Sequence, residues 1–333
     1  MLESIQFTNF RVLKNTTLPL GRFTLLVGPN GSGKTTALRA FEAVSNPSNI
    51  FPTLVTAGVP AEASVEVALV WGAPYKGVIT RANWSRSGRP GLTFSSSGPT
   101  VLSDSLKQSM SVQLSGIRVY SLHGNTLIEP APIDATAHVQ NDGRGLAAVL
   151  DRLKDREPER WQALNHELSS CLPEFDHVLL DSSHGKKSFS LRMRNGHHSI
   201  AAAQLSQGTV FVLAILTLAH LPDPPLVACF EEPDRGIHPR LLRRVQDALY
   251  RLSYPENFGE SREPVQVIAT THSPYFLDLF KDHPEEIVIA EKVGNEAQFQ
   301  RLSDRPDVSE ILSGAPLGEV WYSGVLGGVP VER

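Results

Sequence analysis

The sequence predicts an α/β fold built on a mainly parallel core sheet, with an antiparallel β-meander and a smaller second lobe of helices and strands. Three observations predict this class. A glycine-rich loop at residues 28–36 separates an apolar strand from a helix. Apolar runs at 226–230 and 265–269 alternate with helical segments, which is typical of right-handed crossovers in a parallel sheet. Residues 64–95 show the two-residue period of half-buried strands, interrupted by turn residues.

The first hundred residues are expected to contribute most of the strands and one helix. Two short strands join around Asn9 and Arg11 and lead into the strand before the glycine-rich loop. The helix after that loop presents Ala37 and Phe41 on one face and stops before Pro47. The expected strands are 2–7, 16–20, 23–27, 64–71, 77–84 and 91–95, and the helix is 34–44.

The middle of the chain is expected to mix helices with a small set of strands. Pro158 is a good first-turn residue, and the helix that it opens carries Trp161 and Leu168 on one side. Asn195-Gly196 is a strong hairpin signal. The expected helices are 146–153, one after 158, 210–219 and one from 239, and the expected strands are 112–120, 176–181, 187–194 and 197–201.

The glycine-rich loop has the pattern of a phosphate-binding loop: a glycine, four free positions and then Gly-Lys-Thr. Glycines let successive backbone N–H groups point into one concavity, and the helix N-terminus adds its positive dipole end. Lys34 then reaches the β- and γ-phosphates, and the Thr35 hydroxyl is placed to ligate Mg²⁺. The sequence therefore predicts a P-loop NTPase with ATP and Mg²⁺ as cofactors. The expected nucleotide-binding residues of the loop are Gly28, Pro29, Asn30, Gly31, Ser32, Gly33, Lys34, Thr35 and Thr36.

Two other apolar strands end in reactive side chains. Glu231 and Glu232 come directly after the run 226–230, and His272 comes three residues after the end of the run 265–269. In a parallel sheet the carboxyl ends of neighbouring strands face the same crevice. We therefore expect these side chains to meet the phosphate loop around one ligand.

Each of these residues is given a role in ATP hydrolysis. Glu231 is expected to join Thr35 in the shell of Mg²⁺, while Glu232 orients the attacking water. Glu232, His272 and Lys34 form the expected catalytic set. The alternatives are a solvated acidic turn for the two glutamates and, for the histidine, a core side chain capped by the serine that follows it.

Composition bounds the function classes. The chain has 333 residues, a net charge of −4 and 41% hydrophobic residues, so its charge alone does not indicate a nucleic-acid binder. Cys171 and Cys229 lie in apolar contexts without zinc-site spacing, which favours core packing in a reducing cytosol. We expect no signal peptide, and the longest apolar run, 210–221, is too short to span a bilayer. The expected localisation is cytoplasmic, without a membrane partner.

The order of the motifs resembles the ATP-binding-cassette (ABC) ATPases, in particular the branch of RecF, the structural-maintenance-of-chromosomes (SMC) heads and the overcoming-lysogenisation-defect ATPases. The resemblance covers nearly the whole chain. Residues 205–209, Leu-Ser-Gln-Gly-Thr, resemble the signature motif, and residues 231–239 resemble the Walker B motif and the loop after it. Residues 271–274 match the switch-histidine segment, and 9–11 match the start of RecF-like heads. The ending at 317–328 resembles stand-alone ATPases of this branch.

The resemblance implies an ABC-ATPase head that works in two copies. Ser206 and Gly208 are implied to act in trans on the ATP bound at Lys34 of a partner copy, and Arg11 is implied to lie near the nucleotide. ATP then joins two heads and hydrolysis releases them. The implied lobe I is approximately 1–100 and 226–333, and lobe II, which carries the signature motif, is approximately 100–225.

Several features depart from the family pattern. Glu231 stands where many relatives have aspartate. The glutamine that links Mg²⁺ to the second lobe has two candidates, Gln113 and Gln140. No long heptad insertion is present, so coiled-coil arms are not expected, and the segment after His272 is too short for a fused nuclease domain.

The leading functional prediction is a Mg²⁺-dependent ATPase whose ATP-driven dimer serves DNA repair, DNA maintenance or anti-phage defence. An alternative is a slow ATP sensor that recruits a protein effector, such as a nuclease encoded nearby. A third is the nucleotide-binding subunit of a membrane transporter, against which residues 236–239 and 272–274 argue. A motor of the RecA kind would lack the signature motif.

DNA is a further candidate partner, through basic residues in the two strand-rich regions, although a solvated sheet face is the alternative. The candidate contacts are Arg81, Arg86, Arg89, Lys186, Lys187, Arg192 and Arg194. No role is assigned to His123, His197 or His198.

Overall fold

The computed structural model describes residues 1–47, 55–60, 63–86, 90–98, 100–134, 136–196, 198–294 and 296–327. Two compact units share these residues, and the chain passes between them several times. The first unit comprises Met1–Val119, Pro225–Cys229 and Val265–Arg333, and the second comprises Tyr120–Pro224 and Phe230–Pro264. The assignment of two lobes of an ATPase head to particular residues stays a prediction.

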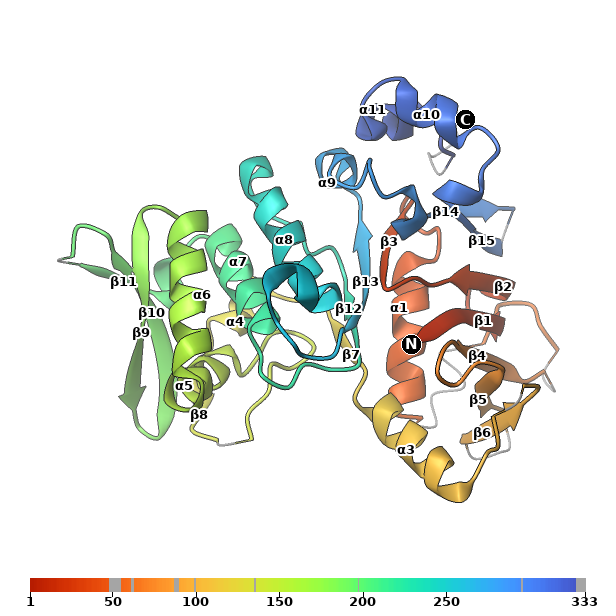
Figure 1. Ribbon diagram of the computed structural model, residues 1–333, viewed down its shortest axis with the longest axis horizontal. Coiled ribbons are helices and arrows are strands. Elements are labelled where there is room, and N and C mark those ends of the chain that lie inside the picture. Colours follow the sequence, from red (N-terminus) through yellow and green to blue (C-terminus); the bar gives the residue numbers. More distant parts are fainter. Residues whose placement is uncertain are drawn as a thin grey trace. The chain divides into compact units, whose positions relative to one another are not determined.

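A six-stranded sheet forms the core of the first unit, in the order β15-β14-β3-β13-β12-β7 (Figure 1). Strand β3 pairs in parallel with β13 and β14, whereas β14 and β15 are antiparallel. Every residue of β3 and β13 is buried, as expected for strands covered on both faces. The strands are β3 (Phe23–Val27), β7 (Arg118–Tyr120), β12 (Val227–Phe230), β13 (Gln266–Thr271), β14 (Ile287–Val293) and β15 (Glu296–Arg301).

A second, five-stranded sheet of the first unit has the order β2-β1-β4-β5-β6 and is antiparallel throughout. This confirms the predicted meander. Its buried side chains, including Phe7, Phe10 and Trp71, share one core with Leu38 and Phe41 of helix α1 (Lys34–Ser45). The strands are β1 (Leu2–Phe10), β2 (Leu13–Pro19), β4 (Val65–Trp71), β5 (Val78–Trp84) and β6 (Gly91–Ser96).

The strand predicted at 112–120 is wrong for most of its length, because residues before 116 form helix α3 (Asp104–Ser115). Ser103 caps this helix, since its hydroxyl accepts a hydrogen bond from the N–H of Leu106 at 3.2 Å. Met110 and Leu114, four residues apart, are buried on one helical face, while Val112 is 66% exposed. The apolar residues of this segment therefore belong to a helix that Ser103 caps, and not to a strand.

The C-terminal part of the first unit contains elements that were not predicted. Strands β14 and β15 extend the core sheet past β3, and three short helices follow or precede them along the chain (Figure 1). The helices are α9 (Pro274–Asp278), α10 (Val308–Ser313) and α11 (Leu317–Tyr322), with 3₁₀ turns at Pro284–Glu286 and Leu302–Asp304.

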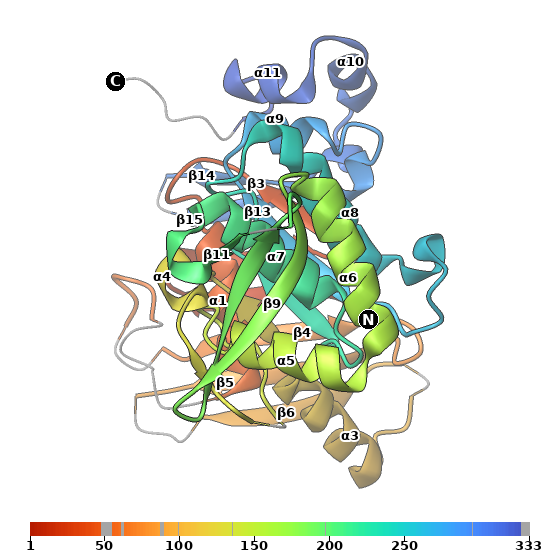
Figure 2. The same ribbon diagram turned by 90° about the vertical axis from the view of Figure 1, so that its left-hand side faces the viewer.

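The second unit packs four longer helices with a small antiparallel sheet. Helix α6 packs against β9, as Figure 2 shows, and every residue of α7 from Thr209 to Ala219 is buried, as predicted. Pro239 opens a 3₁₀ turn, Pro239–Leu241, before α8 begins. The helices are α4 (Gly124–Leu127), α5 (Leu146–Arg156), α6 (Pro158–Cys171), α7 (Gln207–Ala219) and α8 (Leu242–Ser253), with 3₁₀ turns at Ala202–Gln204 and Pro255–Phe258. The strands are β8 (Ala131–Pro132), β9 (Phe175–Ser183), β10 (Lys186–Met193) and β11 (Ser199–Ala201).

A cluster of ionic side chains joins the helices of the second unit. The carboxylate of Glu167 lies 2.9 Å from Nε2 of His220 and 3.2 Å from Arg251. Arg251 also binds Glu260 at 2.9 Å, and Arg262 binds the same carboxylate at 2.6 Å. Burial opposes ionisation of Glu167, but the hydrogen bond from His220 and the charge of Arg251 outweigh it and lower the pKa of Glu167.

Both cysteines are free and buried, as predicted for core residues. Burial, followed by the negative charge of Glu167, raises the pKa of Cys171 to about 11, and burial alone raises the pKa of Cys229. Neither thiol is therefore a nucleophile at neutral pH. Across the described ranges no helix has the length and apolar character to cross a membrane.

Candidate functional site

The phosphate loop in the first unit is shaped by glycines that leave no room for side chains. A Cβ at Gly28 would lie 2.1 Å from the carbonyl oxygen of Ala290 in β14. At Gly33, which has a φ of +96°, a Cβ would meet the side chain of Ala297 at 2.9 Å and that of Leu13 at 3.0 Å. Gly31 also has a left-handed φ of +78°. The strands around the loop therefore fix its path, and glycine is required at both contact positions.

Lys34 is 5% exposed and begins helix α1. Its ammonium group donates hydrogen bonds to the carbonyl oxygens of Gly28 at 2.8 Å and Pro29 at 2.9 Å. The side chain is thus held against the loop that it belongs to. Of the other predicted loop residues, Ser32 is buried, Pro29, Thr35 and Thr36 are half-buried, and Asn30 and Gly31 are exposed.

Arg11 lies in the tight connection between β1 and β2 and has a positive φ, as does Asn9 near the end of β1. It lines a cavity of about 610 Å³ together with Val12, Val55 and Lys292. Burial, and then the neighbouring charge of Arg39 in α1, lowers the pKa of the Arg11 guanidinium. Val12 also lies 3.4 Å from the Cβ position of Gly33, so this cavity adjoins the phosphate loop.

His272 follows β13, whose last residue, Thr271, is in parallel register with Val27 of β3. Gly28 and His272 are therefore the next residues of two neighbouring strands, at the same edge of the sheet. The hydroxyl of Ser273 accepts a hydrogen bond from the N–H of Phe276 at 3.3 Å, so this serine caps helix α9, and His272 is half-buried and not part of the core.

The two glutamates follow β12, which lies beside β13 in the sheet order, and they open a stretch of the second unit. Both are half-buried, and the N–H of Glu231 donates to the carbonyl of Tyr120 at 2.8 Å. Glu232 has a φ of +48°, a left-handed conformation that costs a non-glycine residue about 1 kcal/mol. Such strain is common at functional positions, and no sequence signal indicated it.

The signature region of the second unit is held by close backbone contacts. Ser206 caps α7, with its hydroxyl accepting the N–H of Thr209 at 3.2 Å, and it is exposed. A Cβ at Gly208 would lie 2.7 Å from the carbonyl oxygen of Gly236, in the loop after the glutamates. The signature motif and that loop therefore pack directly together within one unit.

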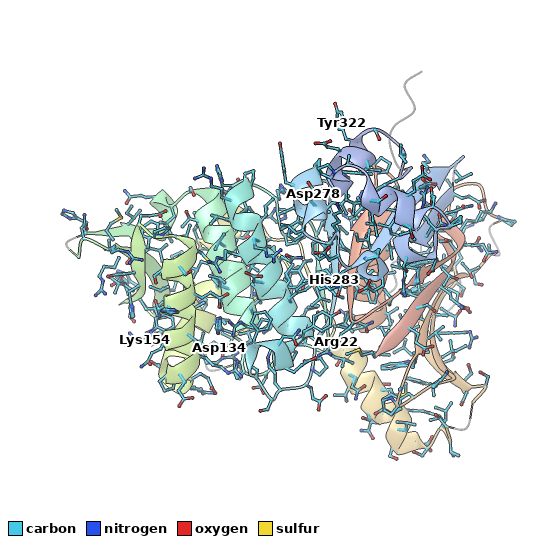
Figure 3. The ribbon with its side chains drawn as sticks, turned by 45° about the horizontal axis from the view of Figure 1, so that its top comes forward. Arg22, Asp134, Lys154, Asp278, His283 and Tyr322 are labelled. Atoms are coloured by element: carbon cyan, nitrogen blue, oxygen red, sulfur yellow. The ribbon has the colours of Figure 1, made fainter. Side chains whose placement is uncertain are left out.

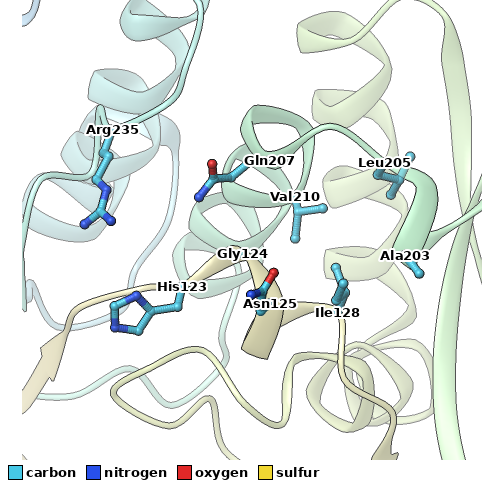
Figure 4. Close-up of a pocket in the computed structure, with 9 residues that line it drawn as sticks. All are labelled: His123, Gly124, Asn125, Ile128, Ala203, Leu205, Gln207, Val210 and Arg235. Carbon is cyan, nitrogen blue, oxygen red and sulfur yellow. The ribbon is translucent and has the colours of Figure 1, made fainter.

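A cavity of about 400 Å³ opens beside the signature motif (Figure 4). The polar side chains around it are His123, Asn125, Gln207 and Arg235, from three separate segments of the second unit. Leu205 and three other aliphatic residues line its apolar side. Among the described residues that line it there is no carboxylate, so the cavity favours a polar or anionic group. Sequence reasoning gave no role to His123 or Arg235.

The remaining predicted residues divide between the units. Gln113 is in α3 of the first unit, and Gln140 is in the loop before α5 of the second, where its N–H binds the carbonyl of Arg144 at 2.9 Å. The phosphate loop, Arg11, Lys34 and His272 belong to the first unit, and Ser206, Gly208 and the two glutamates belong to the second. Within the described ranges no group of three or more His, Cys, Asp or Glu side chains is arranged so that it could hold a metal ion.

Most of the basic candidates for DNA contact already have partners in the chain. Arg192 binds Asp176 through two bonds of 2.8 and 3.1 Å, and Lys187 lies 2.7 Å from Asp151. Arg81 binds Ser95 at 2.6 Å, and Arg194 binds two backbone carbonyls. These contacts favour the alternative of a solvated sheet face. Arg86 and Lys186 are exposed, whereas Arg89 and His197 lie outside the described residues.

Comparison with known families finds two matching models. One, described as "AAA domain, putative AbiEii toxin, Type IV TA system", matches residues 80–278. The other, described as "AAA ATPase domain", matches residues 1–85. The two models together span the phosphate loop, the signature motif, the glutamates and the switch-histidine segment.

Similar proteins and structures point the same way. An OLD nuclease of Thermus scotoductus is 38% identical over 82 residues, which are 22% of this chain and only 15% of that protein. The crystal structure of an SMC head bound to the C-winged helix domain of ScpA has a TM-score of 0.65 at 17% identity, covering 90% of this chain and 96% of that one. The SMC head domain from Thermotoga maritima has a TM-score of 0.54 at 16% identity, covering 90% and 98%. These structural similarities confirm the predicted fold class.

Proposed function

The chain belongs to the AAA-domain family that matches residues 80–278, within the RecF, SMC and overcoming-lysogenisation-defect branch of ABC-type ATPases, and from this we propose that a pair of chains binds and hydrolyses ATP with Mg²⁺. One observation carries the proposal: the loop between β3 and α1, in which Gly28 and Gly33 exclude side chains and Lys34 is held at the loop. A strand, glycine loop and helix N-terminus in this order form a phosphate site.

Lys34 is proposed to bind the β- and γ-phosphates. Its ammonium has three donor hydrogens, and the two carbonyl contacts keep the group at the loop, where phosphate oxygens are stronger acceptors than carbonyls. The dipole of α1 adds to the attraction, because its N-terminus carries about half a positive charge. Binding and charge stabilisation therefore come from the same short segment.

Thr35 and Glu231 fit Mg²⁺ because a hydroxyl and a carboxylate are the hard oxygen donors that this ion prefers. When bound, Mg²⁺ would neutralise charge on the phosphate oxygens. Glu232 would accept a hydrogen bond from the attacking water and take its proton as the water oxygen attacks the γ-phosphorus, while the bond from that phosphorus to the bridging oxygen breaks and ADP leaves. The half-buried carboxylate in a strained, fixed turn supports that role, and His272 at the neighbouring strand end would contact the same phosphate.

The cavity beside the phosphate loop is proposed to hold the nucleoside. Val12, Val55 and Val59 provide apolar surface for the base, while Arg11 and Lys292 provide positive charge for phosphate oxygens. Its volume of about 610 Å³ is of the size of small-molecule pockets. This arrangement supports the implied position of Arg11 near the nucleotide.

The second copy is proposed to close the site with Ser206 and Gly208. Ser206 is exposed at the start of α7, where the hydroxyl and the helix dipole can meet a phosphate from outside the chain. Arg235 gives the adjacent cavity a positive charge. Gly236 packs closely against Gly208, so the loop that carries Arg235 is held beside the signature motif. These features support an interface that is completed by ATP from the partner.

The process served by ATP hydrolysis is proposed to be DNA maintenance or repair, or anti-phage defence. The partial similarity to an OLD nuclease and the family description that names a toxin of a type IV TA system support a defence-related role. A second candidate is a slow ATP sensor that recruits a protein effector. The exposed side chains of Tyr322 and Val325 near the C-terminal helices, which a protein could cover, favour it.

The test uses the Glu232→Gln form, which keeps the shape of the side chain but removes the proposed base. With Mg²⁺ and ATP, light scattering should give the mass of a dimer, whereas with ADP the mass should equal that of the nucleotide-free protein. If the protein binds ATP but has the same mass with ATP as with ADP, the paired mechanism is contradicted.

A further inference from the structure

The C-terminal helices of the first unit form a groove that the proposed ATP chemistry does not use. Helices α10 and α11 line a cavity of about 520 Å³. We call this cavity the C-terminal groove and define it by Glu310, Ile311, Glu319, Val320 and Val325. Ile311 is buried at its base, Val320 is half-buried, and the two carboxylates and Val325 are exposed. The groove is thus apolar inside and acidic at its edges.

Large apolar side chains stand in solvent around this groove. Tyr322 at the end of α11 is 82% exposed, Val325 is 57% exposed, and Tyr275 of the adjoining helix α9 is 65% exposed. Figure 3 shows Tyr322 at the outer edge of the C-terminal helices. Leaving such groups in water loses about 25 cal/mol for each Å² of apolar surface that a partner could cover. Gathered apolar groups with a polar rim are typical of protein interaction sites.

The charge of the groove is not neutralised from within the described chain. Asp307 is paired with Arg305 through two bonds of 2.9 and 2.8 Å, so this carboxylate is already used. Glu310 and Glu319 have no ion-pair partner in the part of the chain that the structure describes. Two exposed carboxylates beside an apolar floor are complementary to a segment with apolar anchors flanked by Lys or Arg.

The groove is attached to the segment that carries His272. The N–H of Gly318 in α11 donates to the side chain of Asp278 at 2.7 Å, and Asp278 is labelled beside these helices in Figure 3. A Cβ at Gly318 would lie 2.6 Å from the carbonyl oxygen of Pro274. Pro274 begins α9, two residues after His272. The backbones of α11 and α9 therefore pack closely and share a hydrogen bond, so a shift of α11 toward α9 is transmitted to the segment before α9.

We propose that the C-terminal groove binds a partner protein through a short amphipathic segment, apolar on one face and basic at its flanks, and that this binding alters ATP turnover through α9. The docking is independent of ATP, and only its effect on turnover rests on the function proposed for His272. Charge steers the encounter, and the apolar floor and Tyr322 supply the anchoring contacts. Because α10 and α11 have six residues each, about 9 Å of helix, the groove suits a segment of about two turns.

The docking is tested with an 18-residue peptide of leucine and lysine arranged as an amphipathic helix, labelled with a dye and titrated with the full chain. The wild-type chain should bind it with a micromolar Kd, and Glu319→Lys should weaken binding ~10-fold. Glu263→Lys, the same charge change at an exposed site in the second unit, should bind like wild type. Tyr322→Ala should weaken binding without changing the charge.

Three results would overturn the proposal. One is equal binding of a peptide with the same composition in scrambled order, and another is equal binding by Glu319→Lys. The third is sedimentation of the wild-type chain as a dimer without nucleotide that Tyr322→Ala converts to monomer, since the groove would then be occupied by a second copy. Unchanged thermal unfolding of each variant shows that the fold is retained.

The link to ATP is measured separately, as turnover with and without saturating peptide. Wild-type turnover should change at least about twofold, and the Glu319→Lys rate should not change at that peptide concentration. Peptide binding without any change in a measurable turnover would overturn the link through α9. A chain that binds peptide but never hydrolyses ATP would instead contradict the proposed function, so the two failures can be told apart.

Discussion

The phosphate loop and the signature region are both proposed to contact ATP, but they are built in opposite ways. The loop is enclosed by buried strands, its glycines leave no room for a Cβ, and Lys34 is held by two hydrogen bonds within the first unit. The signature region exposes Ser206, Gln207 and Arg235 at its surface, and only its backbone is tightly packed. An enclosed loop can bind a ligand by itself. An exposed set of side chains on a fixed backbone is suited to a ligand that another molecule brings.

The largest effect is expected from Lys34→Ala, which removes the positive charge from the enclosed region. ATP turnover should fall about 100- to 1,000-fold, the usual result of losing a fixed group that stabilises charge on transferring phosphate. Steady-state phosphate release measures this. Lys107→Ala, at a half-buried lysine that pairs with Asp104 on α3, is the control and should hydrolyse ATP like wild type. A modest effect at Lys34 would mean that the loop does not bind phosphate as proposed.

Glu167→Gln should weaken the second unit while leaving nucleotide binding by the first unit in place. His220 would lose its carboxylate partner and Arg251 would keep only Glu260, which should cost about 2 kcal/mol in the free energy of unfolding at pH 7, measured in urea. The folded pKa of Glu167 is below the ordinary value of 4.5. The stabilisation is therefore complete above that value and is lost as the pH falls through the folded pKa.

A matched control for that experiment is Glu263→Gln, an exposed glutamate of the same unit. Its stability should follow wild type at every pH. The difference between wild type and Glu167→Gln should shrink at pH 3, and a difference that stayed constant would contradict the ionic explanation.

Gly208→Ala tests whether the signature backbone must be tight. The added methyl group would lie 2.7 Å from the carbonyl oxygen of Gly236 and should cost about 2 kcal/mol of overpacking. Turnover should fall about tenfold, because the loops of Ser206 and Arg235 shift apart, while ATP affinity at the phosphate loop is kept. Gly91→Ala is the control, since within the described ranges no atom beyond its chain neighbours lies within 4 Å of its Cβ position. Normal turnover in Gly208→Ala would show that this contact has no functional role.

The smallest effect is expected at Arg192, a candidate DNA contact that is paired with Asp176. Arg192→Ala should leave the midpoint of thermal unfolding almost unchanged, because an ion pair at the surface is screened by solvent and contributes little. Binding of duplex DNA, if measurable by gel shift, should keep its salt dependence. A loss of about one unit in the slope of log affinity against log salt would show that this arginine contacts phosphate after all.

Local signals in the sequence were sufficient for the segments around the phosphate loop. The strand at 23–27 has its predicted bounds, and the helix from Lys34 is one residue longer than predicted. Apolar runs, glycine spacing and the following helix are all short-range features, so one window of sequence holds them. The buried helix α7 and the strand β12 were predicted for the same reason.

Features that depend on distant contacts could not be predicted in this way. The reason that Gly28 must be glycine is the carbonyl of Ala290, which is 262 positions later in the chain. Helix α3 depends on the cap at Ser103, which was overlooked, and the left-handed turn at Glu232 has no glycine to indicate it. The cavity with Arg235 joins three segments that only the fold brings together.

The most direct test of the account mixes two inactive forms, Lys34→Ala and Ser206→Arg. In a mixed pair, the phosphate loop of the Ser206→Arg copy faces the signature motif of the Lys34→Ala copy, so one complete site forms. Equal amounts should restore about a quarter of the wild-type turnover, because half of the pairs are mixed and each has one of two sites intact. If the mixture is no more active than its components, Ser206 does not act on ATP held by another chain, and the account is wrong.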